Sequence, residues 1–169
     1  MNKKLIMTLV CIALVFLVIG CVAPQAEKQV VEKMNLLQQK YLIKENFSTN
    51  QAIMNNYIND LSLLKGQNLG GEGKIIEAEL YSAQTFYYLN KALISSTSID
   101  YKKFSCSSKE AKETISSINL AEEYQKKAVS SIQALSPDQK ENLRANQLDT
   151  VKNYEQTISQ IKSFFEQKC

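Results

Sequence analysis

One segment sets the organisation of this 169-residue chain: Gly66-Gln67-Asn68-Leu69-Gly70-Gly71-Glu72-Gly73. It holds four of the five glycines in the sequence, and the only two prolines are Pro24 and Pro137. Glycine and proline are the residues that most disfavour the interior of a helix. The long stretches between these positions are free of both, which predicts a few long helices with well-defined ends.

Three short patterns predict where helices start. Residues 107–110 and 136–139 both match the capping box, in which a serine hydroxyl and a Glu or Gln side chain satisfy free backbone N–H groups at a helix start. Pro137 then occupies the first helical position, where its missing N–H costs nothing. Residues 48–51 are a third match, which predicts a kink or break in the first helix near residue 47.

Apolar residues recur every three or four positions in each expected helix, which is the spacing of one helical face. The stripes contain Met34, Leu37, Tyr41, Met54, Tyr57, Leu61 and Leu64, then Ile76, Leu80, Ala83 and Tyr87, then Ala111, Ile115, Ile118, Gln125, Val129 and Ile132, and finally Gln147, Val151, Tyr154, Ile158, Ile161 and Phe165. The first stripe changes phase near Ser48. The alternation with a period of two that is typical of strands is absent.

We therefore expect an all-α protein with helices over residues 27–65 (kinked near 47), 73–96, 108–134 and 137–167. The connections between them are short, and short connections place neighbouring helices antiparallel. The predicted architecture is an up-down-up-down antiparallel four-helix bundle with a long, kinked first helix.

The first 21 residues have the parts of a signal peptide. Lys3 and Lys4 provide the positive charge, Leu5–Ile19 is apolar except for Thr8, and the small residue Gly20 precedes Cys21. As a helix the apolar run would span roughly 22 Å, which is less than the roughly 30 Å of a bilayer's hydrocarbon core. The segment is therefore short for a membrane-spanning helix.

Residues Leu17–Cys21, together with the preceding signal, resemble the lipobox of prokaryotic lipoproteins. The resemblance implies cleavage before Cys21 and attachment of a diacylglycerol group to its sulfur. Two acyl chains then suffice for a stable membrane anchor. The alternative is an uncleaved signal anchor that extends through Val22 and Ala23.

The resemblance also implies a division of the chain. Residues 1–20 would be the signal peptide, 21–26 the lipidated cysteine with a short tether, and 27–169 the helical domain. Lysines before an apolar segment stay on the cytoplasmic side. We therefore expect a protein anchored by lipid at the extracytoplasmic face of the cell membrane.

Two of the four cysteines remain for pairing, because Cys11 would leave with the signal peptide and Cys21 would carry lipid. If the last two predicted helices pack antiparallel, Cys106 and Cys169 lie about 4.5 Å apart along the helix axis. A disulfide needs a Cα–Cα separation of about 4.4–6.8 Å. We expect a Cys106–Cys169 disulfide, with two free thiols as the alternative in a reducing environment.

The charge pattern does not favour binding to nucleic acid. Lys3 and Lys4 account for two of the 20 basic residues, which leaves 18 basic residues against 17 acidic ones in the rest of the chain. The two signs are interleaved, and Arg144 is the single arginine. Proteins that bind nucleic acid usually present a basic patch or stripe, which this sequence lacks.

The sequence contains no histidine. This excludes Ser-His-Asp and Cys-His catalysis and the Glu-x-x-His metal sites of helical bundles. We therefore expect no enzymatic activity, no metal and no cofactor. Five carboxylates are the candidates for a catalytic acid/base pair, Asp60, Glu77, Glu79, Glu122 and Glu123. We expect them mostly on solvated helix faces.

Two surface features are candidate sites of contact or modification. The glycines of the predicted loop, Gly66, Gly70, Gly71 and Gly73, are candidate contacts for a partner, and the loop lacks the spacing of a phosphate-binding P-loop. Asn46 begins an Asn-x-Ser triplet, which is the acceptor pattern for N-glycosylation.

These observations favour a lipid-anchored binding or structural module for a protein partner of unknown identity. The alternative is a lipoprotein that binds a small molecule in an apolar, tyrosine-lined pocket between helices. That alternative predicts an enclosed cavity lined by residues such as Tyr57, Tyr87 and Tyr154. An enzyme would instead need a buried cluster of carboxylates or tyrosines in a cleft.

Overall fold

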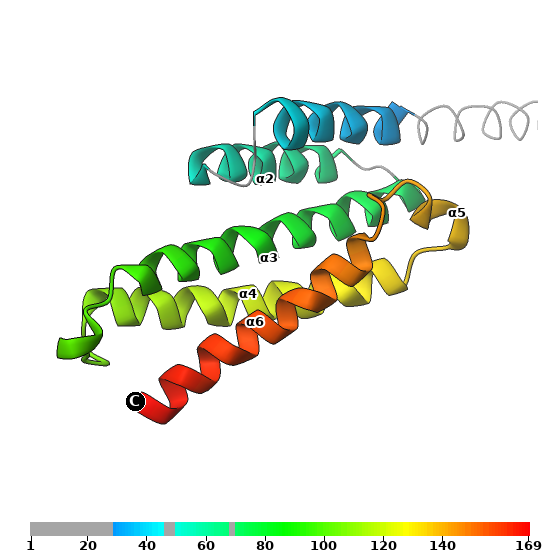
Figure 1. Cartoon of the computed structure of the whole chain (residues 1–169). Coiled ribbons are helices and arrows are strands. Elements are labelled where there is room, and N and C mark those ends of the chain that lie inside the picture. Colours follow the sequence, from blue (N-terminus) through cyan, green and yellow to red (C-terminus); the bar gives the residue numbers. More distant parts are fainter. Residues whose placement is uncertain (1–28, 46–49, 68–69) are drawn as a thin grey trace, which may run out of the picture.

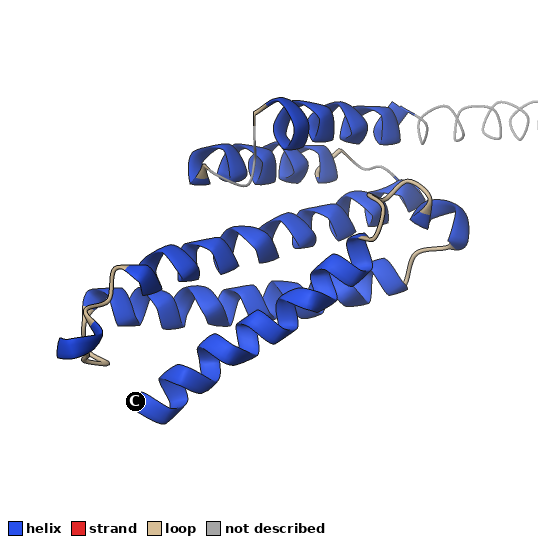
Figure 2. Ribbon diagram, in the orientation of Figure 1, coloured by secondary structure: helices blue, strands red, loops and turns tan. Residues whose placement is uncertain are grey.

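The computed structural model describes residues 29–45, 50–67 and 70–169, and within these ranges it contains helices and no strands (Figure 2). Helical residues 29–38 continue into the π-helical segment η1. The elements that follow are η1 (Gln39–Lys44), α2 (Gln51–Lys65), η3 (Gly70–Glu72), α3 (Gly73–Thr97), η4 (Tyr101–Lys103), α4 (Lys109–Gln133), α5 (Pro137–Lys140) and α6 (Gln147–Lys168). The prediction of an all-α fold is confirmed.

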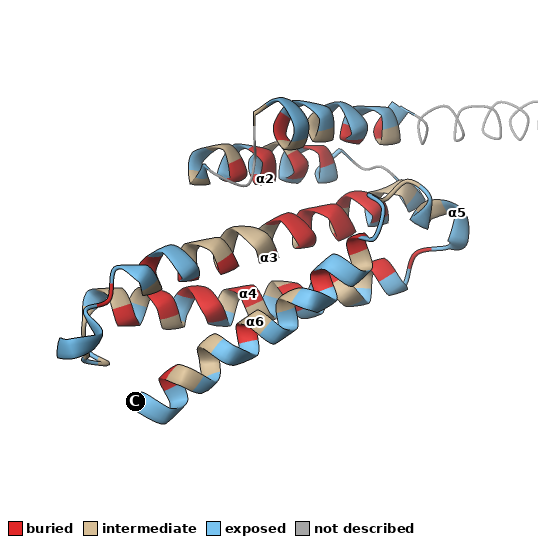
Figure 3. Ribbon diagram, viewed as in Figure 1, coloured by how far each residue is buried: buried red, intermediate tan, exposed pale blue. Residues whose placement is uncertain are grey.

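Helix α3 lies at the centre of the molecule. It packs against α4 and α6 on one side, and α2 packs against it on the other (Figure 1). Buried residues accordingly run along much of α3 (Figure 3). Its fully enclosed side chains include Ile75, Ile76 and Ala78 together with one charged residue, Glu79. The domain is therefore a three-helix unit of α3, α4 and α6 with a helical hairpin packed on α3.

That hairpin corrects the expectation of one long first helix kinked near residue 47. Residues 29–44 and α2 lie side by side and run in opposite directions (Figure 1). Lys33 near the start of the first segment bonds to Gln67 beyond the end of α2, and Tyr41 near its end bonds to Asp60. The chain thus has one more reversal than an up-down-up-down bundle of four helices.

The phase shift of the apolar stripe is the physical reason for this reversal. Met34 and Tyr41 on one segment and Met54 and Tyr57 on the other are all buried. A single kinked helix could not bring both stripes into one core, whereas a hairpin faces them toward each other and toward α3. Asn50 starts α2, because its side-chain oxygen accepts hydrogen bonds from two backbone N–H groups. The serine predicted for this role, at position 48, lies outside the described residues.

The other helix starts agree with the sequence in part. Ser136 and Gln139 form the predicted capping box, with both reciprocal hydrogen bonds present. Helix α4 starts one residue later than expected, because Ser108 rather than Ser107 is the cap and accepts a hydrogen bond from the N–H of Ala111. Each cap follows the general rule that serine satisfies an unpaired N–H in the first turn.

The expected final helix, 137–167, is interrupted. It forms a single turn as α5, leaves the helical path over residues 141–146 and resumes as α6 at Gln147. Asn146 lies in the left-handed region with φ = 59°, a conformation that asparagine adopts more readily than most residues. The two asparagines in this segment, Asn142 and Asn146, are the signal in the sequence for the break.

At the far end of the three-helix unit, Cys106 and Cys169 are joined by a disulfide with a Cα–Cα distance of 5.7 Å. The predicted proximity of these two cysteines is confirmed. The same end carries a cluster of four aromatic rings whose centroids lie 5.3–6.4 Å apart, Tyr101, Phe104, Phe164 and Phe165. We call this region the disulfide end.

Candidate functional site

The interruption between α5 and α6 places Arg144 beside the core. The backbone N–H of Arg144 donates to the side-chain oxygen of Gln147, at 3.2 Å, which ties the loop to the first residue of α6. Gln147 in turn donates to the hydroxyl of Ser82 on α3, at 2.9 Å. Both Gln147 and Ser82 are buried. The loop is thus held against α3 by a chain of two side-chain hydrogen bonds.

The side chain of Arg144 completes a buried polar cluster with Tyr57 of α2 and Glu79 of α3. The Tyr57 hydroxyl donates to Glu79 Oε1 at 2.6 Å. Arg144 Nε lies 3.3 Å from Oε1 and 3.4 Å from Oε2 of the same carboxylate. The Glu79 side chain is 0 % exposed, whereas the Arg144 side chain is 40 % exposed. We call these three residues the Tyr57–Glu79–Arg144 cluster.

Burial and charge together fix the protonation of the two donors. Burial and the neighbouring Glu79 carboxylate raise the pKa of Tyr57 well above its ordinary range, so its hydroxyl remains a hydrogen-bond donor. Burial by itself would lower the pKa of Arg144, but the Glu79 carboxylate outweighs that effect and the pKa is raised. The guanidinium therefore stays charged. A buried carboxylate needs such partners, because an uncompensated charge in the interior is costly.

A cavity of about 260 Å³ opens next to this cluster, between α2, α3 and the start of α6. Its apolar walls are formed by Leu42 of η1, Ala83 and Phe86 of α3, and Val151 of α6. Its polar walls come from residues that can donate or accept hydrogen bonds, namely Tyr57, Ser82, Arg144, Gln147, Thr150 and Tyr154. The walls are thus about equally polar and apolar, which is more polar than the mostly apolar lining of a typical small-molecule site.

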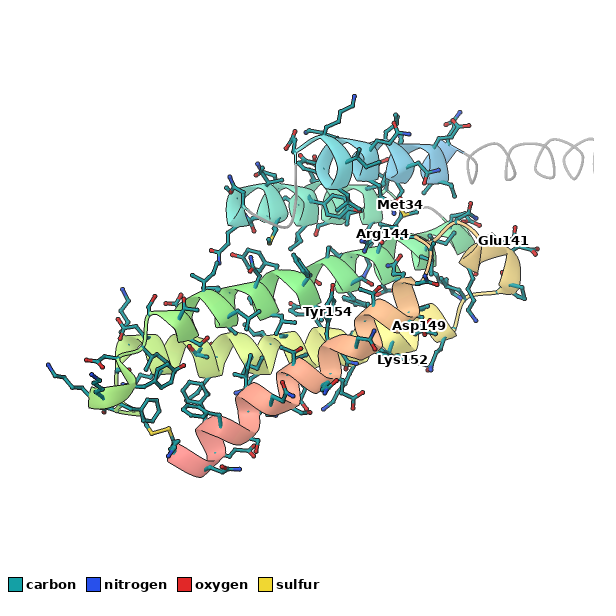
Figure 4. All side chains as sticks on the ribbon, viewed as in Figure 1. Met34, Glu141, Arg144, Asp149, Lys152 and Tyr154 are labelled. Atoms are coloured by element: carbon teal, nitrogen blue, oxygen red, sulfur yellow. A yellow bond between two sulfur atoms is a disulfide. The ribbon has the colours of Figure 1, made fainter. Side chains whose placement is uncertain are left out.

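Tyr154 projects from α6 on the side that faces α3, as does Arg144 from the loop, whereas Asp149 and Lys152 are exposed on the outer face of α6 (Figure 4). The ring of Tyr154 lies against Phe86, with 6.0 Å between centroids and planes tilted by 46°. Burial raises the pKa of the Tyr154 phenol, which therefore stays neutral. The cavity thus has an aromatic corner with a hydroxyl at its edge.

The structure brings together part of the predicted pocket. Tyr57 and Tyr154 line the cavity, but Tyr87 does not; it instead packs edge-on against Tyr88, with 5.0 Å between centroids. The expectation that Glu79 lies on a solvated face is wrong. Glu77 does pair at the surface with Lys65. Glu122 likewise pairs with Lys126, which is also on α4, and with Lys162 on α6.

The predicted partner loop is fixed at one point. The carbonyl of Gly71 accepts a hydrogen bond from Gln139 of α5, at 3.2 Å, and Gly70 has the positive φ of 58° that favours glycine. Gly66 lies just beyond α2, and Gly73 begins α3. The predicted sites Cys21 and Asn46 lie outside the described residues, so the structure does not bear on lipidation or glycosylation there.

Sequence reasoning missed Glu79 and Arg144 as site residues. The signal for Glu79 was its position three residues after Ile76 and one before Leu80, on the buried side of α3. The signal for Arg144 was that it is the single arginine of the chain and lies between two asparagines in a predicted helix. Neither signal indicates by itself that the two side chains meet.

The described ranges contain neither a membrane-spanning helix nor a metal-binding group. Residues 29–45, 50–67 and 70–169 contain no helix with both the length and the apolar character needed to cross a bilayer. No three His, Cys, Asp or Glu side chains in those ranges are grouped so as to hold a metal ion. Comparison of the chain with protein-family models, curated proteins and solved structures gives no match.

Proposed function

We propose that this chain is a lipid-anchored protein of the extracytoplasmic membrane face that binds a small molecule between its helices. The observation that carries the binding proposal is the cavity of about 260 Å³ beside the Tyr57–Glu79–Arg144 cluster. Its volume corresponds to about nine water molecules at liquid density. It is slightly smaller than the cavities of roughly 300–1,000 Å³ that hold drug-sized ligands. The bound molecule is therefore small.

The arrangement favours binding over catalysis. The hydroxyl of Tyr57 and both oxygens of Glu79 are already engaged with each other or with Arg144. A general acid or base must instead be free to exchange a proton with the substrate. The contacts within the cluster therefore hold the Arg144 side chain in one orientation. We propose no enzymatic activity and no cofactor.

The ligand should be recovered with the protein. Full-length chain purified from its own cells without denaturation, then denatured, should release a small molecule that mass spectrometry detects. Ala145 is exposed and lines the cavity, so Ala145→Trp should block it. Ala52 is exposed on α2 and does not line it, so Ala52→Trp is the matched control. Equal release from wild type and both variants, or release from none, contradicts ligand binding.

The anchoring proposal rests on the lipobox resemblance at Cys21. Mass spectrometry of the N-terminus should find residue 21 first and carrying acyl chains, and Cys21→Ser should abolish both features. An intact Met1 without fatty acid contradicts lipid anchoring.

A protein partner is the second candidate function. Three large aliphatic side chains of the helical hairpin are mostly exposed: Leu36 at 64 %, Ile43 at 76 % and Leu63 at 70 %. A contiguous exposed apolar patch marks a protein interface, and this candidate requires that these three side chains belong to one. Cross-linking in the native membrane followed by mass spectrometry should recover the partner, and recovery of none under several growth conditions contradicts this candidate.

A further inference from the structure

The charge on the walls of the cavity has one sign. Arg144 is the single charged residue among those that line it. Glu79, the nearest carboxylate of the cluster, is 0 % exposed and is not part of the lining. A ligand in the cavity therefore meets the guanidinium directly, whereas the carboxylate is covered by its partners Tyr57 and Arg144.

Arg144 has donors to spare. Within the described residues its side-chain contacts are made by Nε alone, which leaves the N–H groups of Nη1 and Nη2 without a protein acceptor. A guanidinium presents these donors as a planar fork that matches the two oxygens of a carboxylate. The contact of Nε with Glu79 fixes the fork in place, so less conformational entropy is lost when a ligand binds.

A second donor and an apolar surface complete the site. The hydroxyl of Tyr154 has no hydrogen-bond partner in the described part of the chain, and Tyr154 lines the same cavity as Arg144. The apolar part of the lining includes the side chains of Leu42, Phe86 and Val151. The site therefore combines hydrogen-bond donors and apolar side chains in one cavity.

We infer that the ligand is a small organic acid, with one carboxylate bound by Arg144 and Tyr154 and a compact apolar or aromatic body held against Phe86. This inference rests on the proposed function, because it identifies the ligand of the same cavity. A cation is the main rival, since aromatic rings and a nearby carboxylate both attract positive charge. We favour the acid because Arg144 stands between the cavity and Glu79, and a bound cation would face the guanidinium.

The test compares probes that share a body and differ in charge. Phenylacetate, phenylacetamide and phenethylamine form one series, and isovalerate, isovaleramide and isopentylamine form an aliphatic one. Each probe is titrated into the full-length chain in detergent by isothermal titration calorimetry. Hydrogen bonds to a charged group contribute about 1.5–3 kcal/mol, so the carboxylate of at least one series should bind about tenfold or more tightly than its amide and amine.

Variants identify which residues cause the preference for the carboxylate probe. Arg144→Gln should remove the preference for the carboxylate, and Arg144→Lys, which keeps the charge but loses the fork, should weaken binding by about tenfold. Tyr154→Phe should weaken it about threefold to tenfold and tests the site independently if loss of Arg144 destabilises the fold. The matched control is Lys152→Gln, which removes an exposed cation of α6 that does not line the cavity. Circular dichroism and the unfolding midpoint verify that each variant is folded.

The failures of the two proposals are distinguishable. Two results contradict the inference that the ligand is an organic acid: tighter binding of an amide or amine, or carboxylate binding that neither Arg144→Gln nor Tyr154→Phe reduces. Neither result contradicts small-molecule binding by the cavity. Absence of binding by all six probes also contradicts the inference that the ligand is an organic acid. If Ala145→Trp and wild type then release the same molecules from cells, the proposed function fails as well.

Discussion

The two ends of the three-helix unit are built on different principles. At the disulfide end, Cys106 and Cys169 join the start of α4 to the end of α6, and four aromatic rings fill the space beside them. At the other end, near the α5–α6 loop, the interior is a partly open cavity beside the Tyr57–Glu79–Arg144 cluster. We call this second region the cavity end.

The difference indicates how stability and binding are divided. The disulfide end is held by a covalent bond and ring packing, and the hollow beside it, which includes Lys162 and Cys169, is more open to solvent than the cavity at the other end. The cavity end retains unpaired donors and unfilled volume, features that cost stability in a protein interior. We infer that the disulfide end holds α4 and α6 together while the cavity end stays available for binding.

The largest effect should follow from removing the disulfide. The two cysteines are 63 residues apart in sequence, and a loop of that length gives about 4 kcal/mol in the chain-entropy model. Cys106→Ser combined with Cys169→Ser should therefore lower the free energy of unfolding by about 4 kcal/mol, measured by urea denaturation. Wild type in reductant should show the same loss. Probe binding by the folded variant should be unchanged. A parallel loss of binding would contradict the inference that one end provides stability and the other provides binding.

A smaller effect should follow at the cavity end from Tyr57→Phe. The variant leaves the buried Glu79 carboxylate without its 2.6 Å donor, which should cost about 1–3 kcal/mol in urea denaturation. The control is Tyr124→Phe, because in the described residues the Tyr124 hydroxyl has no hydrogen bond and its ring stacks on Tyr88. If the two variants are equally stable, the cluster contributes nothing that distinguishes the cavity end.

The smallest effect concerns the ion pair that joins α2 to α3. Lys65 and a hydrogen bond from Tyr81 lower the pKa of Glu77 below its ordinary 4.5, although burial opposes them. The resulting stabilisation is present above the pKa of the unfolded chain and is lost as the pH falls through the lower folded-state pKa. Lys65→Met should therefore destabilise the protein by less than about 1 kcal/mol near pH 7 and by less than that near pH 3.

The matched control for this pH dependence is Lys74→Met, which removes an exposed lysine of α3 that has no ion pair in the described part of the chain. Its unfolding free energy should follow that of wild type at both pH values. A Lys65→Met deficit that is equally large at low pH contradicts the assignment of the effect to Glu77.

Local patterns in the sequence predicted much of the fold. The stripe of α6 places Val151, Ile158 and Phe165 in the core, and the capping box at Ser136 forms as expected, because both depend on residues within one or two turns. The reversal of direction between the segment 29–44 and α2 is larger than the predicted kink. A phase shift in a stripe indicates that the helix cannot continue, but not by how much the chain turns.

The candidate site was less predictable, since it is made by contacts distant in sequence. Tyr57 lies 22 positions before Glu79, and Glu79 lies 65 positions before Arg144. The position of Glu79 beside Ile76 and Leu80 indicates the buried side of α3, but not that Tyr57 of α2 and Arg144 of the α5–α6 loop bind its carboxylate. The loop itself depends on Asn146 adopting a left-handed conformation, which competes with a helix of otherwise good propensity.

The most direct measurement is NMR spectroscopy of the full-length chain with labelled tyrosine rings during a titration with phenylacetate. The signals of Tyr57 and Tyr154, which line the cavity, should shift with saturation, while those of Tyr101 at the disulfide end and Tyr124 on α4 should not. Shifts at Tyr101 or Tyr124 without shifts at Tyr57 and Tyr154 would contradict the assignment of ligand binding to the cavity end.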